Sequence, residues 1–287
     1  MKKQLFKTRP TFQIEATEEA IIARAGLVLP YEMAKALKLP QIIDQELPSA
    51  GSGHGYRPSQ FVMPLILMLH GGGKTLEDLR EIKGEISLRK LMAMEGMPAS
   101  RTVGDWLRRM GGDSRGILGL GKTNDHLIKK ILQKDPETEY TVDQDATIIE
   151  TEKEGAQYTY KKEKGYQPFL GFLSELGIIL NDEFRDGNVH PGFGALESLI
   201  RCNQKMPRGK RIAYLRADSA SYQAKVMNYC FGDNTRKKIL FTITADKDEA
   251  VMAAIKAIPS KEWQPYKDDR EIAETIHTMG KTTEAFR

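Results

Sequence analysis

The strongest constraint on the fold is a change of hydrophobic periodicity near residue 138. Before this point the apolar side chains recur at helical spacing, in residues 15–47, 61–69, 76–82, 87–94, 102–110 and 124–133. No stretch in this half has the pattern of a strand. After it, short runs rich in β-branched and aromatic residues alternate with helical segments. The chain is therefore expected to form a helical part followed by a part that mixes strands and helices.

The order of segments in the second half predicts how its sheet is connected. Strands are expected at residues 140–150, 157–161, 169–173, 178–184, 211–215 and 238–244, and helices at 192–203, 221–229 and 249–258. Consecutive strands favour an antiparallel meander, and the later strand–helix–strand order favours parallel crossovers. We predict an all-helical N-terminal domain over residues 1–135 and a mixed β-sheet with flanking helices over residues 136–287.

Composition limits the classes of protein that the chain can belong to. With 40% hydrophobic residues among 287, it can bury an ordinary core, and its longest apolar run, residues 61–69, is shorter than the roughly 20 residues of a membrane span. Cys202 and Cys230 are the only cysteines and form no CxxC motif, which favours a reducing cytoplasm. The net charge of +4 divides into 21 basic and 15 acidic groups before residue 136 and 22 and 24 after it. A basic N-terminal half is the better candidate for contacting phosphates.

Three aspartates are candidates for a metal site. Asp143 and Asp145 alternate along the predicted strand 140–150, so they share one face, about 6.6–6.8 Å apart. Asp218 follows the apolar residues 212–215, where the next strand would end. If these strands are neighbours, Asp145 and Asp218 meet at the carboxyl edge of the sheet. Two carboxylates can hold Mg²⁺, which supports phosphoryl transfer. The alternative is that they are surface acids and a helix cap.

Basic residues surround these acids in the sequence. Residues 198–217 contain six basic side chains and no acidic one before Asp218. A second cluster, residues 158–166, interleaves lysines with tyrosines. Basic groups bind backbone phosphates, and aromatic rings stack on unpaired bases. The pattern favours a metal-dependent enzyme that acts on a polyanion.

Four segments together resemble bacterial insertion-sequence transposases with a DDE catalytic domain. They are residues 142–148 (VDQDATI), 164–166 (KGY), 184–188 (FRDGN) and 215–219 (LRADS), and the resemblance extends from about residue 20 to the end. It implies an RNase H-like fold in which Asp145 is the first catalytic acid and Asp218 the second, with Asp143 competing for the first role. The family's third acid is a Glu on a later helix, and Glu271 and Glu274 come too soon after Asp218 to match it. We therefore expect the chain to be truncated before that residue.

The same resemblance implies a function and its partners. The chain would cleave DNA at the terminal inverted repeats of an element and join the ends to target DNA, using Mg²⁺ or Mn²⁺. It would act in the bacterial cytoplasm at the nucleoid, and a homodimer in a synaptic complex is expected. Phosphate contacts are expected from Lys161, Lys162, Lys164, Tyr166, Arg185 and Arg216.

The helical half offers a second DNA-binding candidate. Residues 87–94, the turn 95–98 and residues 102–110 could form a helix-turn-helix that places Arg101, Arg108 and Arg109 near phosphates. The alternative is ordinary helix packing, because Trp106 and Leu107 must face a core.

Two other functions compete with a transposase. Residues 116–123 (GILGLGKT), from Gly116 to Thr123, fit the P-loop pattern of a nucleotide-binding protein, although no strand precedes them. A non-catalytic DNA-binding fragment of an insertion element is the other alternative.

Overall fold

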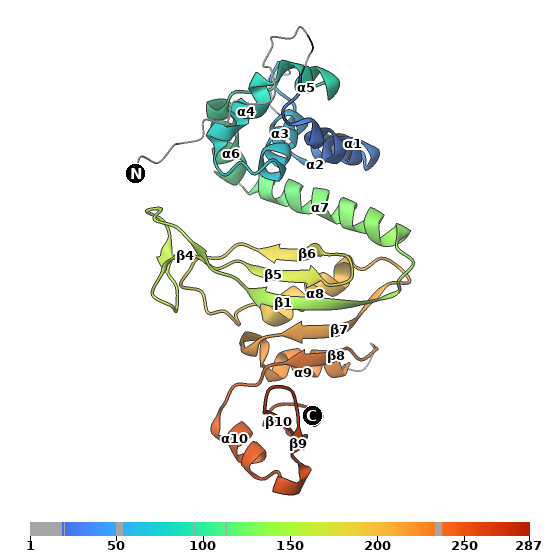
Figure 1. The fold of residues 1–287 in the computed structure, drawn as a ribbon, viewed down its shortest axis with the longest axis vertical. Coiled ribbons are helices and arrows are strands. Elements are labelled where there is room, and N and C mark those ends of the chain that lie inside the picture. The colour runs from blue at the N-terminus through green and yellow to red at the C-terminus, as the bar shows by residue number, and fades with distance from the viewer. Residues whose placement is uncertain (1–18, 20, 50–53, 95, 113, 233–236) are drawn as a thin grey trace, which may run out of the picture. The chain divides into compact units, whose positions relative to one another are not determined.

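The fold consists of two compact units. The computed structural model describes residues 19, 21–49, 54–94, 96–112, 114–232 and 237–287 (Figure 1). The first unit comprises Met1–Leu127 and the second Ile128–Arg287, and the boundary falls within helix α7 (Arg115–Lys134). Each unit has a hydrophobic core of its own.

The described part of the first unit is helical, as the periodicity predicts. Its helices are α1 (Val28–Ala36), α2 (Leu39–Glu46), α3 (Pro58–His70), α4 (Leu79–Gly84), α5 (Ile86–Leu91) and α6 (Ser100–Gly112), with short 3₁₀ turns at Ala25–Leu27 and Leu76–Asp78. Helix α3 is the most apolar and is buried along most of its length. The ring of Phe61 stacks on Trp106 of α6 at 4.7 Å between centroids, so Trp106 belongs to the core.

The P-loop pattern of residues 116–123 lies within helix α7, which contradicts the nucleotide-binding hypothesis. A P-loop is a loop between a strand and a helix, with its backbone N–H groups free to bind phosphates. Here residues 116–123 lie inside one continuous helix, and the hydroxyl of Thr123 donates to the carbonyl of Gly119 at 2.9 Å. The backbone of this segment is therefore used in helical hydrogen bonds. Gly119 serves close packing instead, because a Cβ there would lie 2.5 Å from the carbonyl oxygen of Glu46.

The second unit is built on a mixed sheet with the order β6-β5-β1-β7-β8. Strands β1 (Glu139–Ala146), β5 (Phe169–Leu173) and β6 (Ile178–Glu183) form an antiparallel meander. Strands β7 (Arg211–Ala217) and β8 (Leu240–Ile243) run parallel to β1, and each follows a helix, α8 (Ala195–Lys205) or α9 (Ala224–Phe231). This is the expected RNase H-like arrangement, and β5 has the predicted bounds.

The two faces of the sheet differ. Val142, Leu173 and Leu215 are buried on the face against which α8 and α9 pack (Figure 1). On the opposite face Phe172 and Tyr214 are 36% and 43% exposed. Asp143 and Asp145 alternate with buried neighbours along β1, so their side chains lie on this open face.

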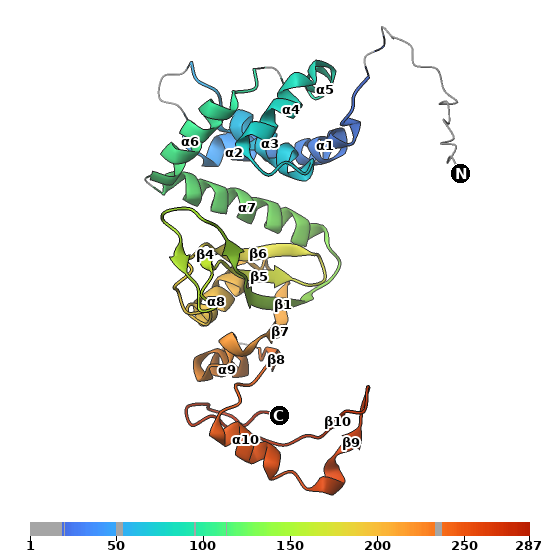
Figure 2. The same cartoon turned by 60° about the vertical axis from the view of Figure 1, so that its left-hand side comes forward.

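A small sheet lies between β1 and β5 in the sequence. It has the order β2-β4-β3, formed by β2 (Ile149–Glu150), β4 (Lys164–Tyr166) and β3 (Gln157–Tyr158) (Figure 2). The sequence predicted one long strand for residues 140–150, but the chain bends after Ala146 and starts a new pairing.

The C-terminal part of the described chain contains α10 (Glu249–Lys256) and the hairpin of β9 (Gln264–Pro265) and β10 (Glu271–Ile272). Glu271 is therefore in a strand, and Glu274 forms an ion pair with Arg287 at 3.1 Å. None of the helices in the described ranges is long and apolar enough to cross a membrane.

Candidate metal site

The pairing of β1 with β7 brings the two principal carboxylates to one edge. The strands are parallel neighbours, with Asp143 opposite Arg216 and Gln144 opposite Ala217. The ladder ends at that pair, and its register extended by one residue would set Asp145 opposite Asp218, on strands spaced about 4.8 Å apart. Both residues lie at the carboxyl ends of their strands, the usual position of ligands in open α/β sheets.

Asp145 and Asp218 are exposed and carry few competing contacts. Within the described residues, the carboxylate of Asp145 makes no hydrogen bond or ion pair. Asp218 accepts one hydrogen bond, from the backbone N–H of Ala220 at 3.0 Å, and caps the 3₁₀ turn Ser219–Ser221. That cap is the alternative role considered for Asp218, and it uses one carboxylate oxygen.

Two carboxylates suit a divalent cation. Mg²⁺ commonly binds one or two protein carboxylates and completes its shell with water and phosphate oxygens. The described residues contain no cluster of three or more His, Cys, Asp or Glu side chains placed to hold a metal. Carboxylate oxygens such as those of Asp145 and Asp218 are ligands that Mg²⁺ and Mn²⁺ prefer, and their role as ligands stays a prediction.

Asp143 has a different environment. Arg216 donates to both of its carboxylate oxygens at 2.6 Å, and the Ser174 hydroxyl donates at 2.9 Å. The hydrogen bonds from Arg216 lower the pKa of Asp143, although partial burial opposes them. Asp143 is therefore ion-paired. Arg216, which the sequence predicted as a phosphate contact, is bound to Asp143 while its side chain is 59% exposed, and its contact with DNA stays a prediction. No pattern in the sequence indicates this role for Ser174.

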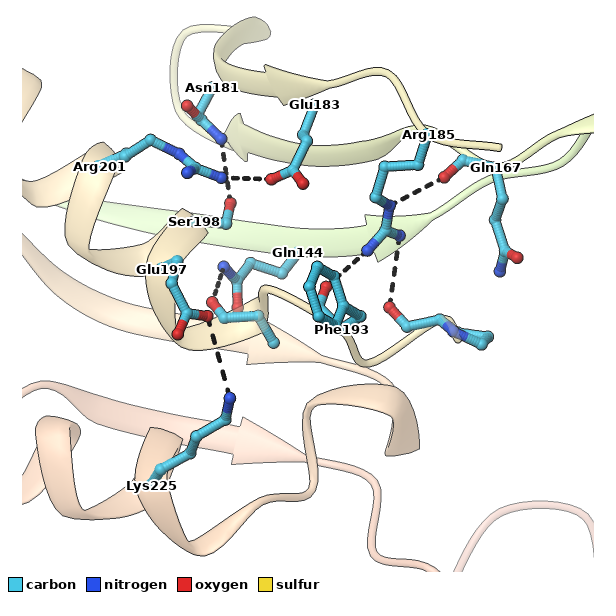
Figure 3. A network of polar contacts seen from close by, with 12 residues as sticks. Gln144, Gln167, Asn181, Glu183, Arg185, Phe193, Glu197, Ser198, Arg201 and Lys225 are labelled. Carbon is cyan, nitrogen blue, oxygen red and sulfur yellow. Dashed lines mark hydrogen bonds and ion pairs between the residues drawn. The ribbon is translucent and has the colours of Figure 1, made fainter. Parts of the chain in front are cut away.

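Three other basic residues before Asp218 are also engaged. Arg211 pairs with Glu139 at 2.8 Å, and Arg201 pairs with Glu183 (Figure 3). Lys210 donates to backbone carbonyls of residues 135 and 137. The basic stretch looks like a phosphate-binding patch in the sequence, but its charges largely hold neighbouring elements together.

Arg185 is a structural residue, which corrects its assignment as a DNA contact. It is 5% exposed, and its guanidinium donates to the carbonyls of Gln167 at 3.0 Å, Phe193 at 2.5 Å and Pro191 at 3.4 Å (Figure 3). It also lies 4.8 Å from the centre of the Phe169 ring. Burial lowers the pKa of Arg185. A phosphate cannot reach a guanidinium enclosed in this way.

Residues 186–194, which include two of the carbonyls that accept from Arg185, connect β6 to α8. A Cβ on Gly192 would lie 2.2 Å from the carbonyl oxygen of Ala220, and Gln223 donates to the Gly192 carbonyl at 2.7 Å. The segment thus packs against the turn that follows Asp218. The side chain of Gln144 on β1 donates to the Ala195 carbonyl at 3.1 Å, which ties β1 to the start of α8 (Figure 3).

The small sheet carries the remaining residues predicted near DNA in this unit. Lys161 and Lys162 are exposed, and Lys164 and Tyr166 are half-buried. Tyr166 and Phe184 form a ring pair with centroids 4.7 Å apart. Phe184 is 65% exposed, and the sequence pattern alone does not mark it as a candidate DNA contact.

The predicted DNA-binding arginines of the first unit lie on α6. Arg101, Arg108 and Arg109 are exposed, and Arg108 pairs with Asp105 at 2.5 Å. Residues 92–99 separate α5 from α6, a longer connection than the turn of about 3–4 residues in a helix-turn-helix. The helix pair therefore departs from that motif, and a DNA contact by these arginines stays a prediction.

Comparison with known proteins establishes the family. The profile of the family described as "Transposase DDE domain group 1" matches residues 6–284, nearly the whole chain. The chain belongs to this transposase family. No curated protein matches it.

Two solved structures resemble this DDE transposase chain distantly. One is the piggyBac transposase synaptic complex with hairpin DNA, at 12% identity and a TM-score of 0.36, covering 82% of this chain and 54% of that one. The other is the Mos1 strand transfer complex, at 13% identity and a TM-score of 0.24, covering 71% and 66%. The transposase chain thus spans about half the length of the first and about two thirds of the second.

Proposed function

We propose that this chain is a DNA transposase that cleaves the ends of an insertion element and joins them to target DNA. Water would break the P–O3′ bond at the element end and leave a 3′-hydroxyl and a 5′-phosphate. The 3′-hydroxyl would then attack a target phosphodiester, form a new P–O bond and release a target 3′-hydroxyl. Family membership supports this chemistry.

The observation that carries the proposal is the register of β1 and β7. In this register Asp145 and Asp218 belong to neighbouring strand ends, while Asp143 forms an ion pair with Arg216. We assign Asp145 and Asp218 as the ligands of Mg²⁺ or Mn²⁺, with Asp143 in support. A divalent cation there supplies a Lewis acid that lowers the pKa of water and stabilises a leaving oxygen.

We further propose that DNA contacts come from both units. In the second unit the candidates are Lys161, Lys162, Lys164 and Tyr166, and in the first Arg101, Arg108 and Arg109. The DNA would comprise the terminal inverted repeats and the target, and a homodimer would hold two ends in a synaptic complex.

The metal assignment is tested by binding. Titration of Mn²⁺ into the full chain, followed by electron paramagnetic resonance, should show a site that is lost in Asp145→Asn and in Asp218→Asn. Asp182→Asn is the matched control, because Asp182 is exposed on β6 and lies opposite Leu170, which in turn lies opposite Asp145. Retention of the site in both test variants would refute the assignment.

The activity is tested by nicking of a plasmid that carries the DNA flanking the coding sequence. Turnover in Mg²⁺ or Mn²⁺, abolished by Asp145→Asn or Asp218→Asn with DNA binding retained, supports the transposase. DNA binding without turnover supports the alternative, a non-catalytic fragment that occupies element ends.

A further inference from the structure

The small sheet presents one face with an unusual set of side chains. In its register Tyr158 is opposite Lys164, and Ile149 is opposite Tyr166. Residues directly opposite each other project to the same side, as do alternate residues along a strand. Ile149, Tyr158, Lys164 and Tyr166 therefore share one face, which we call the tyrosine face. Phe184 extends it by its ring contact with Tyr166.

Residues 186–187 run along the small sheet, where Asp186 bridges to Tyr166, and Glu150 and Gln157 on the other face are exposed. A Cβ on Gly187 would lie 2.4 Å from the carbonyl oxygen of Gln157 and 2.5 Å from that of Gly165. The backbone at Gly187 therefore packs directly on these strands. Glu150, which is opposite Gly165, projects to that other face, so the acidic strand residue points away from the tyrosine face.

The tyrosine face is open. Tyr158 is 67% exposed and Ile149 is 47% exposed. Beyond the end of β3, Tyr160 is 63% exposed, and the ammonium of Lys161 lies 5.8 Å from the centre of its ring. Asp186, which is opposite Tyr166, adds one exposed carboxylate at the edge of this face. Exposed rings bind bases by stacking, and ammonium groups bind phosphates by charge.

The distance to the metal site limits which bases can reach this face. Ile149 follows Asp145 by four residues, so their Cα atoms are at most about 14 Å apart. That is about four base steps of roughly 3.4 Å each. A strand whose phosphate lies at the two aspartates would thus pass the tyrosine face within its next few nucleotides.

We propose that the tyrosine face stacks unpaired bases of the DNA strand held at Asp145 and Asp218. Paired bases keep their faces inside the duplex, so only overhanging, frayed or extruded bases can use it. This inference rests on the proposed function. It adds a preference for DNA ends that have unpaired bases within about four nucleotides of the reacting phosphate.

The test compares two DNA ends bound by the full chain without divalent cations, so that the DNA remains uncut. One end has a four-nucleotide overhang containing 2-aminopurine, and the other is fully paired. We expect tighter binding of the overhang and quenched fluorescence. Tyr158→Ala should weaken binding of the overhang by roughly 5-fold to 150-fold and restore the fluorescence, with little effect on the paired end.

Two variants control for the loss of the ring and for the removal of an exposed tyrosine elsewhere. Tyr158→Phe keeps the ring and should behave as the unmodified chain does. Tyr266→Ala removes an equally exposed tyrosine, 63% accessible, far along the sequence, and should leave both affinities unchanged.

The outcomes separate the two proposals. Equal affinity for both ends, or an equal loss for both in Tyr158→Ala, would overturn base stacking and leave DNA binding in place. Failure to bind either DNA would overturn the proposed function together with this inference.

Discussion

Asp143 and Asp145 are two residues apart on one strand, yet their surroundings give them different chemistry. Asp143 is held by Arg216 and Ser174, whereas Asp145 is exposed beside Asp218. A carboxylate already paired with a guanidinium has less capacity for a cation. The environment, rather than the spacing, therefore separates the structural acid from the candidate ligand.

The Asp143 pair predicts a specific acid sensitivity. Since Arg216 lowers the pKa of Asp143, the stabilisation is complete above the unfolded pKa of about 3.9 and is lost as pH falls through the folded pKa. Asp143→Asn should be less stable than the unmodified chain at pH 6, and the difference should shrink toward pH 2. Urea midpoints across this range measure it, and parallel curves would contradict it.

Arg185 predicts a stability effect without a DNA-binding effect. Arg185→Met would leave buried carbonyls without donors and should cost about 2–4 kcal/mol of unfolding free energy. Arg208→Met, at an exposed position, should change it by no more than about 0.5 kcal/mol. Urea unfolding gives both values, and a neutral Arg185→Met would show that the site relaxes.

The sequence predicted the strand positions of the aspartates, but neither the burial of Arg185 nor the ion pair of Arg216 with Asp143. Alternation along a strand and position at its end depend on local pattern, which the sequence shows directly. Whether an arginine faces solvent depends on distant partners. Arg185 donates to the carbonyls of residues 167, 191 and 193. Arg216 pairs with Asp143 on β1, which is distant in sequence.

At the scale of elements, α7 shows why composition misleads. Its glycines look like a loop, so the sequence predicted a helix only from residue 124, whereas α7 begins at Arg115. The glycines are tolerated because one of them allows close approach to Glu46. By contrast, β5 contains two phenylalanines and is bounded by Pro168 and by the turn at residues 174–177, and its bounds could be predicted to the residue.

Two glycines of α7 give a matched prediction. Gly121→Ala should stabilise the chain by roughly 0.5–1 kcal/mol, because nothing lies within 4 Å of the new Cβ. Gly119→Ala should destabilise it, because its Cβ would meet the Glu46 backbone at 2.5 Å. Thermal midpoints of the two variants should move in opposite directions, and stabilisation by both would mean that α2 and α7 can separate freely.

At the scale of the molecule, each unit holds one of the two tryptophans. Trp106 is buried in the first core, and Trp263 lies in the second unit. Two separate cores favour separate unfolding transitions.

This arrangement predicts where a cation acts. In Trp106→Phe, the remaining fluorescence reports the second unit, and Mg²⁺ should raise its unfolding midpoint, since a ligand bound only to the folded state stabilises it. In Trp263→Phe, the first unit should show no such shift. Adding Asp145→Asn should remove the effect, and equal shifts in both reporters would place the cation elsewhere.

The pairing of Arg216 with Asp143 has a consequence for the order of events. It leaves the edge at Asp145 and Asp218 with two negative charges that this arginine does not balance. A phosphate 4 Å from one carboxylate is repelled by about 1 kcal/mol in water, and by about 4 kcal/mol near a protein surface. Divalent cations would then strengthen the binding of the scissile strand at this edge as well as support its reaction. Monovalent salt should weaken the binding of the duplex, while divalent salt should strengthen the binding of the DNA end at Asp145 and Asp218.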